Sequence, residues 1–159
     1  MKQLLDYRFC TRTVTLYHRL PGKAFAVERK IYKGAFLDWS ENRKETESGT
    51  EYEVNFLLLL PSGVKGRPVY EGPGVYDALT EEERKGRFTL APGDKITRGE
   101  GPNITSAAQW AAFTGKQGAA LVKETAERCM GDAVLHLEAG SSQRLGRSSL
   151  PHPRKGLQW

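Results

Sequence analysis

Two stretches of this chain alternate in polarity with a period of two, and this pattern limits what the chain can fold into. Residues 12–20 read RTVTLYHRL, and residues 51–60 read EYEVNFLLLL. Strict alternation rich in β-branched and aromatic residues is typical of strands. In the second stretch both faces become apolar after Asn55. A strand that is solvent-exposed at one end and buried on both faces at the other suits a barrel whose end is covered by another element or subunit.

The remaining pattern predicts further short elements. A second strand covers residues 27–39, with Gly34 as a bulge or a point of close approach. Residues 40–50, SENRKETESGT, read as an exposed loop. Thr80 and Glu83 form a capping-box match before a short helix at 81–85. Short strands are expected at the following places: 87–90, 95–98 and 134–138.

One helix flanks this β structure, and one segment is ambiguous. Residues 106–113 place Ala107, Trp110 and Ala111 along one helical face. Residues 121–128 have a helical composition, but their position before a turn and a strand also allows a hairpin. The sequence therefore predicts a mainly β, barrel-like domain over residues 1–140, with one short flanking α-helix and an extended C-terminal tail at 141–159.

The positive charge of the chain is concentrated in that tail. The whole chain has 24 basic and 19 acidic residues and a net charge of +5, but the tail alone carries +4 and no acid. A domain that holds duplex DNA normally shows a basic face, whereas this chain shows a basic appendage. The tail has too few apolar groups to fold alone, so we expect it to contact other subunits. The contact residues predicted there are Arg144, Arg147, Arg154, Lys155 and Trp159.

No motif in the sequence predicts catalysis or a cofactor. The histidines at positions 18, 136 and 152 are isolated from one another, and none has a partner at metal-ligand spacing. The Gly-rich stretches EGPG and GEG both lack the Lys-Ser/Thr ending of a phosphate-binding loop. Cys10 and Cys129 match no metal or redox spacing, so we expect free thiols. The longest apolar run, residues 56–60, is too short for a membrane span. We expect a non-enzymatic protein without cofactor, made in cytoplasm and without a membrane partner.

Four segments, taken in order, carry a resemblance. RTVTLYHRL is followed by a polar turn and ERKIYKGAFLDW, and an apolar strand ends at Pro61. YDALTEEERKGRFTLAPGDKITRGEG and ETAERCMGDAVLHLEAG come next. Together they resemble minor structural proteins of siphophages and prophages from Gram-positive hosts, the minor capsid or head-completion proteins of the head-to-tail connector. The chain departs from that pattern at residues 126–128, which read Ala-Glu-Arg instead of Asp-Asn-Arg, and at Leu137, which replaces a Trp.

The resemblance implies a small barrel with one flanking helix, and it implies that residues 121–128 are strand. It also implies a homo-oligomeric ring of about a dozen copies between the portal or adaptor and the tail terminator or tail tube. The ring would lie at the head-to-tail junction of the virion, after assembly in the host cytoplasm. In stopper-like members a charged loop projects into the channel and holds back packaged double-stranded DNA. The residues expected there are Glu41, Arg43, Lys44, Glu45 and Glu47.

Other interpretations of the sequence remain open. A solvated hairpin loop accounts for residues 40–50 as well as a channel loop does. A tail terminator protein, a nucleic-acid-binding small β-barrel and a small enzyme of unfamiliar type are the alternative functions.

Overall fold

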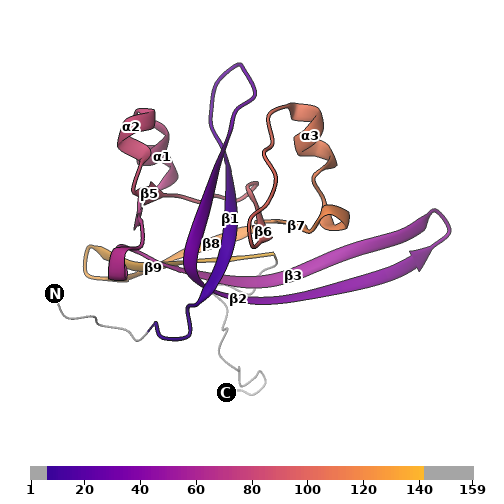
Figure 1. Ribbon diagram of the computed structural model, residues 1–159, viewed down its shortest axis with the longest axis horizontal. Helices are drawn as coiled ribbons and strands as arrows, with labels where there is room; N and C mark the ends of the chain where they lie inside the picture. Colours follow the sequence, from indigo (N-terminus) through magenta and orange to yellow (C-terminus); the bar gives the residue numbers. More distant parts are fainter. Residues whose placement is uncertain (1–6, 142–159) are drawn as a thin grey trace.

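The computed structural model describes residues 7–141 and is built mainly of β-strands (Figure 1). The strands are β1 (Arg12–Arg19), β2 (Val27–Thr46), β3 (Gly49–Pro61), β4 (Val69–Tyr70), β5 (Arg87–Phe88), β6 (Lys95–Arg98), β7 (Ala119–Leu121), β8 (Glu124–Met130) and β9 (Ala133–Gly140). The helices are α1 (Pro73–Asp77), α2 (Glu81–Arg84) and α3 (Ala107–Ala112), with 3-10 turns η1 (Val64–Gly66) and η2 (Gly115–Gln117).

The large sheet is barrel-like, and its two end strands are linked by the chain rather than paired with each other. Its strand order is β7-β6-β1-β2-β3-β9-β8, and every neighbouring pair is antiparallel. The two end strands, β7 and β8, are joined directly by Val122 and Lys123. The Val122 N–H donates to the Asp94 carbonyl at 2.8 Å, and the Lys123 N–H donates to the Gly140 carbonyl at 2.9 Å. The chain therefore passes from one sheet edge to the other, which gives the barrel-like form predicted from the sequence.

Strand β2 belongs to both halves of this barrel. Its first part pairs with β1 and its second part with β3, and the β1 register skips Gly34. Gly34 has φ +100°, a backbone conformation that residues other than glycine rarely adopt. The Arg67 Nε donates to the Gly34 carbonyl at 2.9 Å from the adjacent loop. The bulge predicted at Gly34 is thus confirmed, and it is also a point of close approach.

The core fills the barrel interior with side chains from nearly every strand. Val14 and Leu16 of β1 point inward, as their alternation predicted. The Tyr32 hydroxyl donates to the Pro61 carbonyl across the core, so its polar atom is satisfied although it is buried. The other buried members of the core are Ala35, Phe56, Leu58, Leu60, Tyr70, Phe88, Leu90, Ile96, Ala120, Val122, Leu137 and Ala139.

Helix α3 covers the outside of the barrel next to β1. Tyr17, on the opposite face of β1 from the core, packs edge-on against Phe113 with ring centroids 4.9 Å apart. The Lys95 ammonium donates to the carbonyls of Trp110 and Phe113 at 2.6 and 2.7 Å, at the C-terminal end of the helix, where a cation is favourable. The predicted flanking helix is confirmed, with Ser106 as its N-cap.

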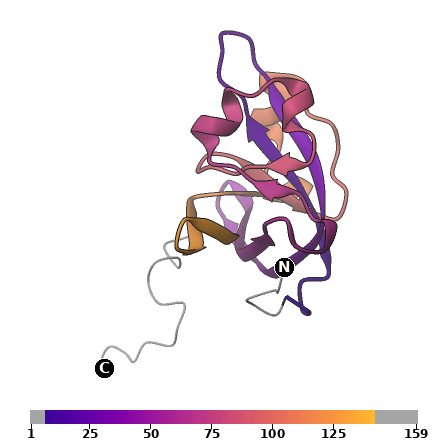
Figure 2. The same cartoon turned by 90° about the vertical axis from the view of Figure 1, so that its left-hand side faces the viewer.

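The remaining segments of the described chain are mostly short strands and helices. Residues 121–128 are largely strand, and β8 forms a hairpin with β9. The capping box of Thr80 and Glu83 is present at the start of α2, and α1 is a further short helix. The Gly- and Pro-rich stretch 64–74 contains η1, β4 and the start of α1. Viewed from the side, the β1–β2 connection projects from one end of the barrel (Figure 2).

The bend in β2 gives a stability prediction. A Cβ at residue 34 would lie 2.3 Å from the Arg67 Nε, and the positive φ adds strain. We expect Gly34→Ala to lower the free energy of unfolding by about 2 kcal/mol or more. Gly74→Ala is the control, because a Cβ there meets nothing within 4 Å. Thermal unfolding of both variants checks this, and equal melting temperatures would show that β2 does not depend on the glycine.

Candidate functional site: an exposed hairpin arm

The ends of β2 and β3 form a two-stranded arm that projects beyond the barrel. We define the arm as residues 40–55, with a two-residue turn at 47 and 48. Figure 1 shows it extending far to one side of the molecule. The sequence placed residues 40–50 in a loop, which is wrong: the pairing of β2 with β3 continues out to Thr46 and Gly49. The charged side chains are exposed, as expected, but they lie on strands.

The two faces of the arm differ. One face continues the core outward through Val54 and Tyr52, and the Arg43 guanidinium lies 5.7 Å from the Tyr52 ring centroid. At its root, Arg98 donates to the Glu41 carboxylate at 3.0 Å. The opposite face is polar, with Asn42 opposite Glu53 and Lys44 opposite Glu51. The first face therefore carries the two large apolar side chains of the arm, Val54 and Tyr52, together with charged residues.

An isolated two-stranded ribbon is only marginally stable in water, because it buries little apolar surface. In the described part of the chain, β3 pairs with β9 only at Leu57–Pro61, so the arm has no third strand. Tyr52 keeps 37% of its surface exposed near the middle of the arm. These features indicate that the arm is stabilised by contact with a further polypeptide segment.

A groove runs beside the arm on its apolar side. Its volume is about 320 Å³, and Tyr52, Val54, Phe113, Leu121 and Ser141 contribute to its lining. Backbone atoms of Tyr52 lie close to Gly115 of η2, which forms the opposite wall. The groove is open and partly apolar, so its shape suits a polypeptide segment better than an enclosed small molecule.

The residues predicted as a channel loop are brought together by the arm. Glu41, Arg43, Lys44 and Glu45 lie on β2, and Glu47 lies in the turn. With Glu51 and Glu53 the arm holds five glutamates and two basic residues, a net charge of −3. The predicted tail contacts, Arg144, Arg147, Arg154, Lys155 and Trp159, lie outside the described residues.

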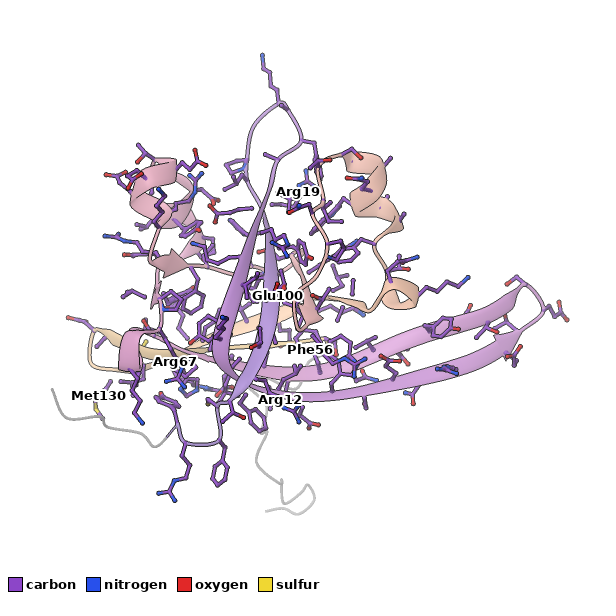
Figure 3. The ribbon with its side chains drawn as sticks, viewed as in Figure 1. Arg12, Arg19, Phe56, Arg67, Glu100 and Met130 are labelled. Carbon is purple, nitrogen blue, oxygen red and sulfur yellow. The ribbon has the colours of Figure 1, made fainter. Side chains whose placement is uncertain are left out.

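Ser141 was assigned to the tail, but it belongs structurally to the barrel. It is buried, its N–H donates to the Phe56 carbonyl at 3.4 Å, and its hydroxyl accepts from the Phe56 N–H at 3.0 Å. Phe56 lies at the root of the arm (Figure 3). The chain thus reaches the arm at the point where the described residues end.

Histidine 18, which the sequence left as an isolated structural residue, lies between two carboxylates. Its Nδ1 is 2.6 Å from Asp94 Oδ2 and its Nε2 is 2.7 Å from Asp77 Oδ1. Burial lowers the pKa of His18, but the contacts with Asp94 and Asp77 outweigh it and raise the pKa above its ordinary value of 6.5. Asp94 also accepts from the backbone of Arg19 and Ala91. Both ring nitrogens are therefore occupied, which is a structural arrangement rather than an accessible catalytic base.

A second polar cluster joins β8, β9 and the start of the described chain. Arg128 donates to Glu138 at 2.9 Å, and His136 lies 3.1 Å from the same carboxylate and 2.9 Å from the Tyr7 hydroxyl. The hydrogen bond with His136, together with Arg128, lowers the pKa of Glu138 to about 2 although burial opposes this. Sequence reasoning missed both clusters. The members of the first lie far apart along the chain, and in the second only Tyr7 is distant, while Arg128 and His136 meet Glu138 through the pairing of β8 with β9.

Residues 7–141 contain neither a metal-binding cluster nor a helix that could span a membrane. No group of three or more His, Cys, Asp or Glu side chains in this range could hold a metal ion. Within the same range, no helix has the length and apolar character needed to cross a membrane. Both cysteines are free, Cys10 buried and Cys129 exposed.

Comparison with known proteins gave one match. Residues 9–142 match a family described only as a family of unknown function (DUF6751), which covers most of the chain. No curated protein matches the chain. No solved structure matches it either.

The buried histidine gives a prediction about pH. A group whose pKa is raised by folding stabilises the protein fully below its unfolded pKa and loses this contribution as the pH rises through its folded pKa. We therefore expect the free energy of unfolding to fall as the pH is raised above about 6.5. His18→Gln removes the charged partner of the buried Asp94 carboxylate and of the partly exposed Asp77 carboxylate, and it should cost about 3 kcal/mol near pH 6.

Urea unfolding at several pH values between 5.5 and 9 measures both effects. The difference between wild type and His18→Gln should shrink as the pH rises. A constant difference over this range would mean that His18 is neutral in the folded protein.

Proposed function

We propose a structural role for this chain, which belongs to that family of unknown function: it is one subunit of a homo-oligomeric ring in the head-to-tail connector of a tailed bacteriophage or prophage. The ring would join the portal or adaptor to the tail. The observation that carries the proposal is the arm, a two-stranded ribbon that extends from a compact barrel and has no third strand in the described residues.

A ring needs two different contact surfaces on opposite sides of each subunit. The arm leaves the barrel on one side. Met130, with 56% of its surface exposed, lies at the other end of the molecule, at the tip of the β8–β9 hairpin (Figure 3). An arm on one side and an exposed apolar group on the other support head-to-tail contact between identical subunits.

The charge of the arm affects whether it can contact DNA or a neighbouring subunit. A net charge of −3 repels phosphate, and proteins that hold DNA release counterions through Lys and Arg. This favours contact of the arm with a neighbouring subunit over contact with packaged DNA. The same charge disfavours a nucleic-acid-binding role for this face of the barrel.

The arm predicts how assembly responds to substitution. We expect Tyr52→Asp to weaken ring formation at least tenfold, about 1.4 kcal/mol per contact, because it places a charge on the apolar face. Glu51→Gln is the matched control on the opposite face of the same strand and should assemble like wild type. Native mass spectrometry gives the oligomer distribution, and circular dichroism checks the fold. If both variants assemble equally well, the arm is not the contact surface.

The connector role itself is tested by electron microscopy. The purified protein should form rings, alone or when produced with the structural proteins encoded beside it. Particles assembled in its absence should accumulate as heads without tails. A protein that stays monomeric under all these conditions, and whose loss leaves tailed particles unchanged, does not have this role.

A further inference from the structure

We propose that the arm of one subunit binds in a basic groove along the open edge of β2 in the next subunit. We call this groove the β2 groove. It is lined by residues 28–31 of β2 and by residues 66–68 and 84–86 opposite, and its volume is about 570 Å³. The inference rests on the proposed ring, because it names the surface that each arm contacts there.

The first part of β2 has one unpaired edge. The Leu20 N–H donates to the Ala26 carbonyl at 3.0 Å, directly next to the pairing of β1 with β2. Because hydrogen-bonded residues alternate along an antiparallel pair, the even-numbered residues of β2 exchange hydrogen bonds with β1. The peptide groups of Arg29, Ile31 and Lys33 therefore point away from β1. In the described chain, no strand pairs with that edge before the pairing with β3 begins.

An open strand edge can accept a further strand, because its backbone donors and acceptors lack partners. The side chains along this edge determine which strands it accepts. Residues 29–33 read RKIYK, with three basic residues and no acid. Like charges opposite one another destabilise a strand pair, whereas opposite charges stabilise it. The edge of β2 therefore favours an acidic segment.

The rest of the β2 groove adds to this positive charge. Its lining includes four basic residues, Lys30, Arg67, Arg84 and Lys85, and two glutamates. Lys30 and Arg67 donate to backbone carbonyls, and Lys30 also donates to the Tyr76 hydroxyl. Neither forms an ion pair with a carboxylate among residues 7–141, whereas Arg84 is paired with Glu28 at 2.8 Å. A carboxylate from another subunit would neutralise this charge.

The arm has the complementary charge and a matching length. Its tip, residues 45–51, reads ETESGTE, with three acids and no base. Residues 40–46 and 49–55 pair with each other, and no third strand joins them in the described chain. Each of these segments spans about 23 Å when extended, which is also the span of residues 27–33. The acidic arm therefore matches the basic edge in charge and in extent.

The β2 groove and the arm lie on opposite sides of the subunit. Arg67, which lines the groove, is labelled in Figure 3 on the side of the barrel away from the arm. The arm therefore extends away from the groove of its own subunit. Two different surfaces on opposite sides give a head-to-tail contact between identical subunits, which is the contact that a ring repeats.

An exchange of charge between the two surfaces tests the contact in the full chain. The arm variant carries Glu45→Lys and Glu47→Lys, and the groove variant carries Lys33→Glu and Lys85→Glu; all four side chains are exposed. Each variant alone should form rings at least tenfold more weakly than wild type, because like charges meet at every contact. An equimolar mixture should assemble to within threefold of wild type, because each arm then meets a groove of opposite charge.

Lys23→Glu with Lys116→Glu is the matched control, because it changes two exposed lysines outside the groove by the same charge. It should assemble like wild type and should not rescue the arm variant. Native mass spectrometry measures the oligomers, and circular dichroism checks the fold. Wild-type rings with a mixture that fails to assemble would overturn this contact but leave the ring in place. A wild type that forms no rings would contradict both proposals.

Hydrogen exchange tests whether the arm adds to β2 as a strand. In rings, the N–H groups of Arg29 and Ile31 should exchange at least tenfold more slowly than in dissociated subunits, because the arm bonds to them. The N–H groups of Lys30 and Tyr32 are bonded to β1 in both states and are the internal control. Unchanged exchange at Arg29 and Ile31 in wild-type rings would show that the arm does not occupy this edge.

Discussion

The barrel depends on one strand that pairs in both halves of the large sheet. Strand β2 pairs with β1 along its first part and with β3 along its second, and it changes partner at Gly34. Arg67 holds this bend from outside, because it donates to the carbonyls of Gly34 and Cys10. A straight β2 would leave the two halves of the barrel apart. The bend also sets the direction in which the remainder of β2 leaves the barrel, and so it positions the arm.

Much of the barrel could be predicted from the sequence, because hydrophobic periodicity reports which face of a strand is buried. The alternation in β1 placed Val14 and Leu16 in the core and Tyr17 on the other face, and the structure agrees. The strand that turns apolar on both faces after Asn55 is the part of β3 that enters the barrel. The capping box of Thr80 was also predicted correctly, because its partner Glu83 lies within one helical turn of it in the sequence.

The arm and the polar clusters could not be predicted in the same way. Periodicity detects burial, and the outer half of the arm has no buried face, so its strands look like a charged loop. The arm forms through backbone pairing across a two-residue turn. Such pairing does not require apolar side chains, so no hydrophobic pattern in the sequence marks it. His18, Asp77 and Asp94 meet only because β1 passes beside α1 and the 91–94 turn, and a single sequence carries no record of that proximity.

The way the sheet closes has a consequence for how the chain acquires its fold. The β1–β2 and β2–β3 pairs join neighbouring segments, and the arm turn is local. Closure instead requires Val122 and Lys123 to bridge β6 and β9, and Tyr7 contacts His136 at a separation of 129 residues. Contacts between such distant residues slow folding, because the chain must lose much conformational freedom before they form. During synthesis, the arm can pair early, while the barrel stays open until its last strand leaves the ribosome.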